Sequence, residues 1–131
     1  MATSNNSPTY RVRITLKNTT HWPLTMAGQK TQSGAKWETY LPQVIDERSE
    51  GSWSEIMGTI TDDAEGFAEY SLCDGDNILD IKISWLSPSA DGERKAVFKS
   101  AMEGDEQRKY QIKNTSDANP HSNVTFTISK K

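Results

Sequence analysis

The chain has 131 residues, with 18 Asp and Glu against 15 Lys and Arg and a net charge of -3. This length suits one domain that buries about two-thirds of its unfolded surface without help from disulfides. The mildly acidic balance excludes long-range attraction to nucleic acid, so we expect no nucleic-acid partner. Cys73 is the single cysteine, which excludes an internal disulfide.

The first eight residues, MATSNNSP, are polar and lack the basic and apolar regions of a secretion signal. We expect 1–8 to be a disordered polar leader and 9–131 to be a single domain. No window has the length of a transmembrane helix. The sequence therefore predicts cytosolic synthesis without a signal peptide, followed by release or by action at a target membrane surface.

Short runs of alternating apolar and polar residues recur along the chain, as in half-buried strands. The clearest stretch runs from Gly66 to Phe98, where two such runs flank the hairpin turn that Asp74-Gly75 predicts. The segment 28–34 is polar and predicts a loop, whereas 96–106 fits a helix and a strand with a turn equally well. The runs lie at 10–17, 22–26, 36–41, 52–60, 68–72, 79–85, 96–102, 109–113 and 124–128.

Turn signals separate these runs about every ten residues, which is the spacing of a sandwich and not of a βαβ fold. No helical apolar stripe is three turns long. We therefore predict an all-β fold: a single-domain antiparallel β-sandwich of about eight to nine strands.

Residue chemistry offers no catalytic, metal or cofactor motif. His21 and His121 are each predicted to lie in a loop beside a proline, and they lack the spacing of metal ligands. The carboxylates Asp62 and Asp63 lie in a predicted turn, where burial and pKa tuning are not expected. The sequence thus predicts no enzyme, no metal and no cofactor.

Aromatic residues are more informative, because four Trp and four Tyr exceed what a core of this size needs. Trp85 shares a face with apolar neighbours and is predicted to be core, while Trp53 is balanced between core and surface. Trp22 and Tyr40 lie beside prolines, as rings at a rim would. Such rings suit a membrane interface, a sugar or a choline-type cation, and packing under loops is an equal alternative.

A series of short motifs resembles one family over residues 9–129. These are Lys17-Asn18-Thr19-Thr20, the Gly-Ala-Lys-Trp-Glu segment at 34–38, Gly51-Ser52-Trp53, and the strand 81–85 followed by Pro88 and Gly92. In this order they resemble the aegerolysin and actinoporin-like β-sandwich proteins.

The resemblance implies a two-sheet protein that binds membrane lipids, often sphingolipids. It also implies that some such proteins form pores only together with a larger perforin-like partner, which makes such a protein a candidate partner here. The chain departs from the family where Leu86 follows the strand tryptophan, since an acidic residue is favoured there. Residues 1–9 offer no amphipathic helix, so we expect no pore formation by this chain alone.

Two binding functions follow. In the first, a sphingolipid-type head group meets aromatic rings and a cation for its phosphate, with Lys36 as the candidate cation. In the second, a lectin resembling the fungal fruit-body lectins presents the same rings to a glycan. A structural protein without a ligand is a third alternative, and a homo-oligomer stays open. The predicted ligand-binding residues for either ligand are Trp22, Lys36, Trp37, Tyr40 and Trp53.

Overall fold

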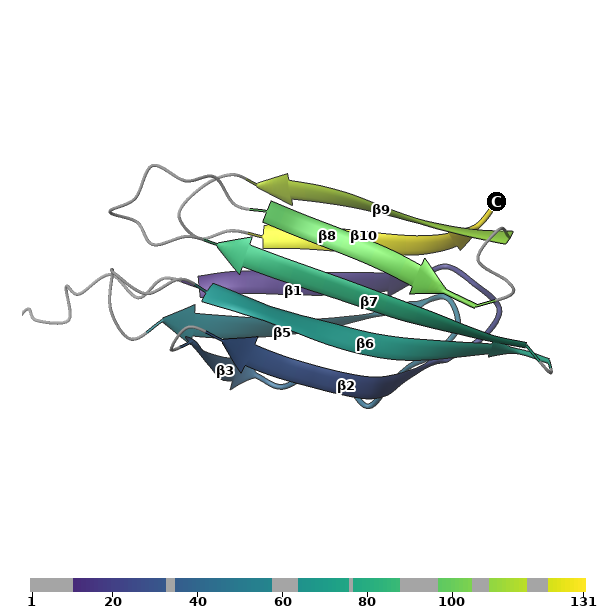
Figure 1. The fold of residues 1–131 in the computed structure, drawn as a ribbon, viewed down its shortest axis with the longest axis horizontal. Helices are drawn as coiled ribbons and strands as arrows, with labels where there is room; N and C mark the ends of the chain where they lie inside the picture. Colours follow the sequence, from purple (N-terminus) through teal and green to yellow (C-terminus); the bar gives the residue numbers. More distant parts are fainter. Residues whose placement is uncertain are drawn as a thin grey trace, which may run out of the picture.

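The computed structural model describes residues 11–32, 35–57, 64–75, 77–87, 97–104, 109–117 and 123–131. They form two five-stranded sheets stacked as a sandwich (Figure 1). The predicted β-sandwich is confirmed, with ten strands in place of eight or nine. The predicted leader at 1–8 lies outside the described residues. Within these stretches no helix is long and apolar enough to cross a membrane.

The first sheet has the strand order β3-β5-β1-β10-β9. Its neighbours are antiparallel except β1 and β10, which pair in parallel with Ile14 opposite Val124. This pair is the exception to the predicted antiparallel pattern. Strands far apart in sequence need no hairpin between them, so their relative direction is free of a turn's constraint. The bounds are β1 Arg11–Asn18, β3 Ala35–Thr39, β5 Ser49–Met57, β9 Tyr110–Asp117 and β10 Asn123–Lys130.

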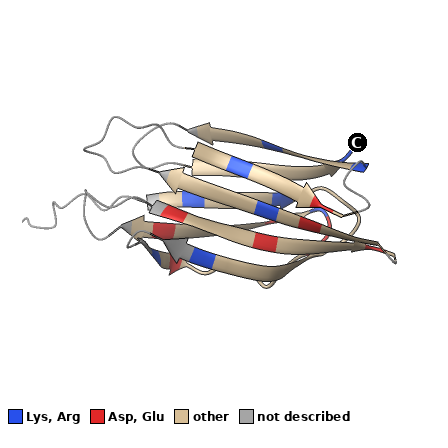
Figure 2. Ribbon diagram, in the orientation of Figure 1, with Lys and Arg blue, Asp and Glu red and all other residues tan. Residues whose placement is uncertain are grey.

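The second sheet has the order β4-β2-β6-β7-β8, with all neighbours antiparallel. The hairpin between β6 and β7 closes where Asp74-Gly75 predicted it, and Gly75 has a φ of 68°. Acidic and basic residues both lie along β6, β7 and β8 (Figure 2). The bounds are β2 Leu24–Gln32, β4 Val44–Ile45, β6 Ala64–Asp74, β7 Asn77–Ser87 and β8 Val97–Glu103.

The structure corrects the prediction for one segment, 28–34, and decides between the alternatives for another, 96–106. The described part of the predicted loop 28–34 is the second half of β2, with Lys30 opposite Phe67 and a register shift between Met26 and Gly28. The irregularity breaks the alternation by which sequence analysis finds a strand. The alternative at 96–106 is settled in favour of a strand, since Val97–Glu103 pairs with β7.

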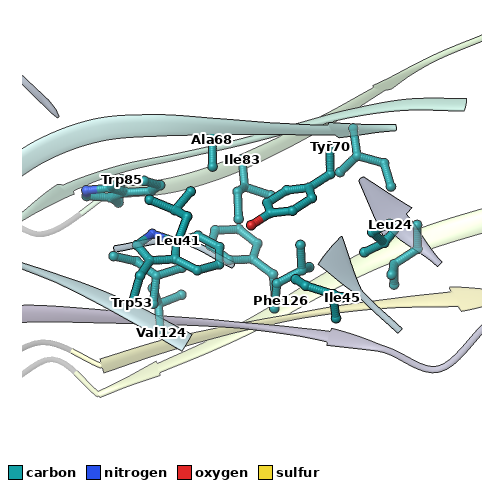
Figure 3. Close-up of a cluster of buried hydrophobic side chains, with 14 of the residues drawn as sticks. Leu24, Leu41, Ile45, Trp53, Ala68, Tyr70, Ile83, Trp85, Val124 and Phe126 are labelled. Atoms are coloured by element: carbon teal, nitrogen blue, oxygen red, sulfur yellow. The ribbon is translucent and has the colours of Figure 1, made fainter. Parts of the chain in front are cut away.

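The core fills the space between the two sheets, where inward side chains of both meet (Figure 3). Trp85 is buried, as predicted. Tyr70 is also buried, and its hydroxyl donates to the carbonyl oxygen of Pro42 at 2.7 Å. Burial raises the pKa of this tyrosine. That bond fixes the segment 40–48, which crosses from β3 in one sheet to β4 in the other and back to β5.

Candidate functional site

A buried asparagine joins two loops at one end of the sandwich. Asn18 ends β1, and its side-chain nitrogen donates to the carbonyl oxygens of Trp22 (2.8 Å), Ile45 (3.2 Å) and Asp46 (3.1 Å). Its side-chain oxygen accepts from the backbone nitrogen (3.0 Å) and the hydroxyl (2.6 Å) of Thr20. Both halves of the amide are therefore satisfied. We call residues 17–23 and 45–50, which this side chain joins, the Asn18 end.

Trp22 lies in the loop that Asn18 holds. Its carbonyl oxygen also accepts from the Thr20 hydroxyl at 3.0 Å, and its backbone nitrogen donates to that hydroxyl at 3.2 Å. The side chain is 37% exposed. A partly exposed indole on a backbone with this many bonds loses little conformational freedom on meeting a ligand.

Arg48 stands on the other side of the Asn18 end. It has a φ of 55°, the single positive φ of a non-glycine residue among those described. A guanidinium nitrogen lies 3.3 Å from Nδ1 of His21. The left-handed conformation costs a residue with a Cβ about 1–2 kcal/mol, so an arginine there suggests a functional reason.

A groove of about 450 Å³ opens beside this arginine. One cation in it, Lys17, is 4.0 Å from the carboxylate of Glu50. Arg48 forms no ion pair within the described part of the chain. The groove can therefore accept an anionic group at the guanidinium. It is lined by Lys17, Asn18, Thr19, Arg48, Ser49 and Glu50.

The crossing segment adds apolar surface next to the Asn18 end. Tyr40 is 74% exposed and Val44 is 48% exposed. Val44 lies opposite Thr25 of β2, three residues after Trp22 in the chain. Exposed apolar side chains and an unpaired cation thus occur on two segments that Asn18 ties together.

Two other predicted site residues lie elsewhere. The indole nitrogen of Trp37 donates to Gln29 at 3.1 Å, and its ring packs edge-on to Trp85 at 6.1 Å. Trp37 is opposite Glu55, which is opposite Val12 at the start of β1. Val12 and Asn18 are six residues apart on β1, so Trp37 lies about 20 Å along the strands from Asn18. The structure therefore does not bring Trp37 and its exposed neighbour on β3, Lys36, together with Trp22.

Trp53 requires a correction. The sequence left it balanced between core and surface and counted it as a ligand contact, but its side chain is 0% exposed. It packs against Trp85 at 6.0 Å and Tyr70 at 6.2 Å between ring centroids. Alternation along β5 points it into the core, so a ligand at the surface cannot reach it.

Sequence reasoning missed a buried acid beside these rings. Glu55 is 0% exposed, and the indole nitrogen of Trp85 donates to its Oε1 at 2.5 Å. In the described structure, its Oε2 and the indole nitrogen of Trp53 have no hydrogen-bond partner. Burial raises the pKa of Glu55 to about 8, the Trp85 bond lowers it and the nearby Glu65 carboxylate raises it. The side chain is therefore mostly neutral at pH 7.

Strand β6 of the other sheet leaves room for the Glu55 carboxyl because it carries a glycine, Gly66, at this point. A Cβ on Gly66 would lie 3.0 Å from Oε2 of Glu55 and 2.9 Å from the Trp85 ring. The signal in the sequence was the position of Glu55, two residues after Trp53 on the same face of a strand. We call Glu55, Trp37, Trp53 and Trp85 the tryptophan cluster.

Across the described stretches, no group of three or more His, Cys, Asp and Glu side chains is placed to hold a metal ion. No protein family and no characterised protein matches the sequence. Among solved structures, that of the lipid binding protein Nakanori is similar, with a TM-score of 0.73 and 13% identity over 92% of this chain and 71% of that chain. The likeness is one of fold. It agrees with the two-sheet fold that the sequence resemblance implied, and membership of that family stays a prediction.

Proposed function

We propose that this protein binds membrane lipids through the Asn18 end. The observation that carries the proposal is the fully bonded Asn18 amide, which holds the exposed Trp22 loop and the Arg48 segment in one arrangement. A fold shared with a lipid binding protein supports the same function, although at 13% identity it argues by analogy alone.

The chemistry of the site suits a zwitterionic head group. An indole is apolar over most of its surface and has one polar edge, so Trp22 suits the membrane–water interface. The guanidinium of Arg48 suits a phosphate, because its planar donors match two phosphate oxygens. Aromatic rings such as Trp22 and Tyr40 attract a quaternary ammonium through cation–π contacts. A sphingolipid head group with phosphate and choline presents both charges.

The net charge of -3 makes bulk attraction to an anionic membrane weak, so we propose recognition of the head group itself. We further propose that the protein acts at a target membrane surface as the binding component of a pore-forming pair with a larger perforin-like protein. The purified chain should then bind vesicles without releasing entrapped dye. Dye release by the chain alone would contradict this division of roles.

Co-sedimentation with phosphatidylcholine liposomes, with and without sphingolipid and sterol, tests the proposal. We expect pelleting that depends on sphingolipid and an apparent Kd that rises about tenfold or more in Trp22→Ala, because a buried interfacial anchor is worth about 1.4 kcal/mol or more. Arg48→Ala should weaken binding to a similar extent. Trp22→Phe should retain most of it.

Lys113→Ala is the matched control, since Lys113 is an exposed cation on β9. Equal losses in Lys113→Ala and Arg48→Ala would show that charge alone, and not the Asn18 end, carries binding. No pelleting with any lipid would sink the proposal. Pelleting only with vesicles that carry a glycolipid, together with binding to the free glycan, would favour the lectin.

A further inference from the structure

The outward face of the second sheet carries a row of cations. Lys30 on β2 lies opposite Phe67 on β6, which lies opposite Ser84 on β7, which lies opposite Lys99 on β8. The amine of Lys82, two residues along β7 from Ser84, lies 4.5 Å from the centre of the Phe67 ring. We call Lys30, Lys82 and Lys99 the lysine row. Basic residues on β2, β7 and β8 are blue in Figure 2.

A row of carboxylates follows along the same strands. Asp80 on β7 lies directly opposite Glu103 on β8, and Glu69 on β6 lies opposite Lys82. The hydroxyl of Ser71 donates a hydrogen bond to Asp80 at 2.9 Å. We call Glu69, Asp80 and Glu103 the acidic row.

Lys82 and Glu69 face each other, but the other four charges of the two rows have no opposite charge directly across a neighbouring described strand. Like charges directly opposite on neighbouring strands are destabilising, and Asp80 and Glu103 form such a pair. None of the six side chains in the two rows forms an ion pair within the described residues. Lys30 and Lys99 lie at one end of the face and Asp80 and Glu103 at the other, with Lys82 and Glu69 opposite each other between them. The two ends therefore become complementary when one copy of the face is reversed against another.

We propose that this face binds the same face of a second copy of the chain. The two-fold axis lies between the sheets, runs across the strands and passes the level of Ala101. Lys99 and Glu103 stand on either side of Ala101 on one strand. Reversal about the axis therefore places Lys99 of each copy opposite Glu103 of the other.

Glu69 and Lys82 share the level of Ala101 and therefore stand at the axis, next to each other on neighbouring strands. The Lys82 amine lies 4.5 Å from the centre of the Phe67 ring, and Phe67 is on the side of the axis that faces Asp80 of the second copy. Ala101 is small and lies at the axis, which lets the two sheets approach to about 10 Å. Two grooves of about 440 and 480 Å³ on this face, which include Lys99 and Glu103 respectively, can receive the side chains of the partner.

The contact is of modest size. Four strands at about 4.8 Å and seven residues at about 3.4 Å span about 450 Å², against about 800 Å² per partner in a standard interface. We therefore expect a weak dimer whose population rises with protein concentration and falls with added salt.

Sedimentation velocity over a concentration series at low salt tests the proposal. The wild type should shift from monomer to dimer, and Lys99→Glu and Glu103→Lys should each weaken the dimer at least tenfold. The Lys99→Glu/Glu103→Lys double variant should restore it. An equimolar mixture of the two single variants should form a heterodimer, because one chain then carries two acidic side chains at these positions and the other two basic ones.

Restoration by mixing excludes misfolding as the cause of each loss. Lys113→Glu is the control and should dimerise as the wild type does, since Lys113 lies on the other sheet. A wild type that stays monomeric at millimolar concentration and low salt would overturn the proposal. So would single reversals that leave the dimer unchanged, or a double variant that fails to restore it. Lys99 lies at the level of Lys30, eight residues along the chain from Trp22, so the lipid assay with Lys99→Glu tests the two proposals separately.

Discussion

The Asn18 end and the tryptophan cluster use the same ingredients in opposite ways. In the first, a buried polar side chain makes five hydrogen bonds and the tryptophan is exposed. In the second, Trp53 and Trp85 are buried and the polar side chain, Glu55, keeps one oxygen that has no hydrogen-bond partner among the described residues. A satisfied buried amide orders the chain around it, whereas an unsatisfied buried carboxyl lowers stability. The comparison is in line with the proposal that the first region binds the ligand, and it predicts a structural role for the second.

Of the two buried polar side chains, the one at the Asn18 end should have the larger effect on stability when it is removed. Asn18→Ala leaves the carbonyl oxygens of Trp22, Ile45 and Asp46 without this donor, and we expect a loss of about 3–4 kcal/mol of unfolding free energy. Urea denaturation measures it. Asn114→Ala, at an exposed position on β9, is the control and should change stability by less than about 0.5 kcal/mol. A loss that small in Asn18→Ala would break the comparison.

The tryptophan cluster should respond with the opposite sign. Glu55→Gln keeps an acceptor for the Trp85 indole and removes the ionisable group, so we expect a gain of about 2 kcal/mol at pH 7. The folded-state pKa of Glu55, about 8, lies above its ordinary value of 4.5. Its contribution to stability is therefore fully present below pH 4.5 and is lost as the pH rises through 8.

The midpoints of urea denaturation, measured between pH 4.5 and 9, distinguish the wild type from Glu55→Gln. The wild type should lose stability across this range by up to about 1.4 kcal/mol per pH unit, and Glu55→Gln should show a much flatter profile. Parallel profiles would mean that Glu55 titrates as an ordinary exposed acid. Glu50→Gln, an exposed acid on the same strand, is the control for the general effect of removing one charge.

The smallest effect on stability sharpens the contrast between tryptophans. Trp22→Ala should cost less than about 1 kcal/mol, because the ring is partly exposed and its backbone bonds remain. Trp53→Ala should cost about 3–5 kcal/mol, because it empties a core position. Thermal unfolding of the pair at equal concentration measures both. Similar losses would mean that the Trp22 ring is structural and would weaken its assignment to a ligand.

The alternation of apolar and polar residues, with the turn residues between the runs, was enough to predict the fold class and the hairpin at Asp74-Gly75. It failed at Gly28, where a bulge breaks the period, and at the parallel pairing of β1 with β10, which no turn specifies. The aromatic residues were recognised as a group. Which of them lie together was not predictable. Trp37 lies level with the start of β1 and Trp22 follows its end, and only the pairing register of the strands shows this.

The sequence by itself determined that this protein is a β-sandwich with Trp85 in its core. Side chains alternate between the two faces of a strand, so a buried face appears in the sequence as an apolar residue at every second position. Tertiary structure alone decided the site. Asn18 reaches carbonyl groups of residues 45 and 46 that are 27 and 28 positions away. Such long-range hydrogen bonds leave no local pattern, and they make the end of β1 the point that joins the Trp22 loop to the segment before Arg48.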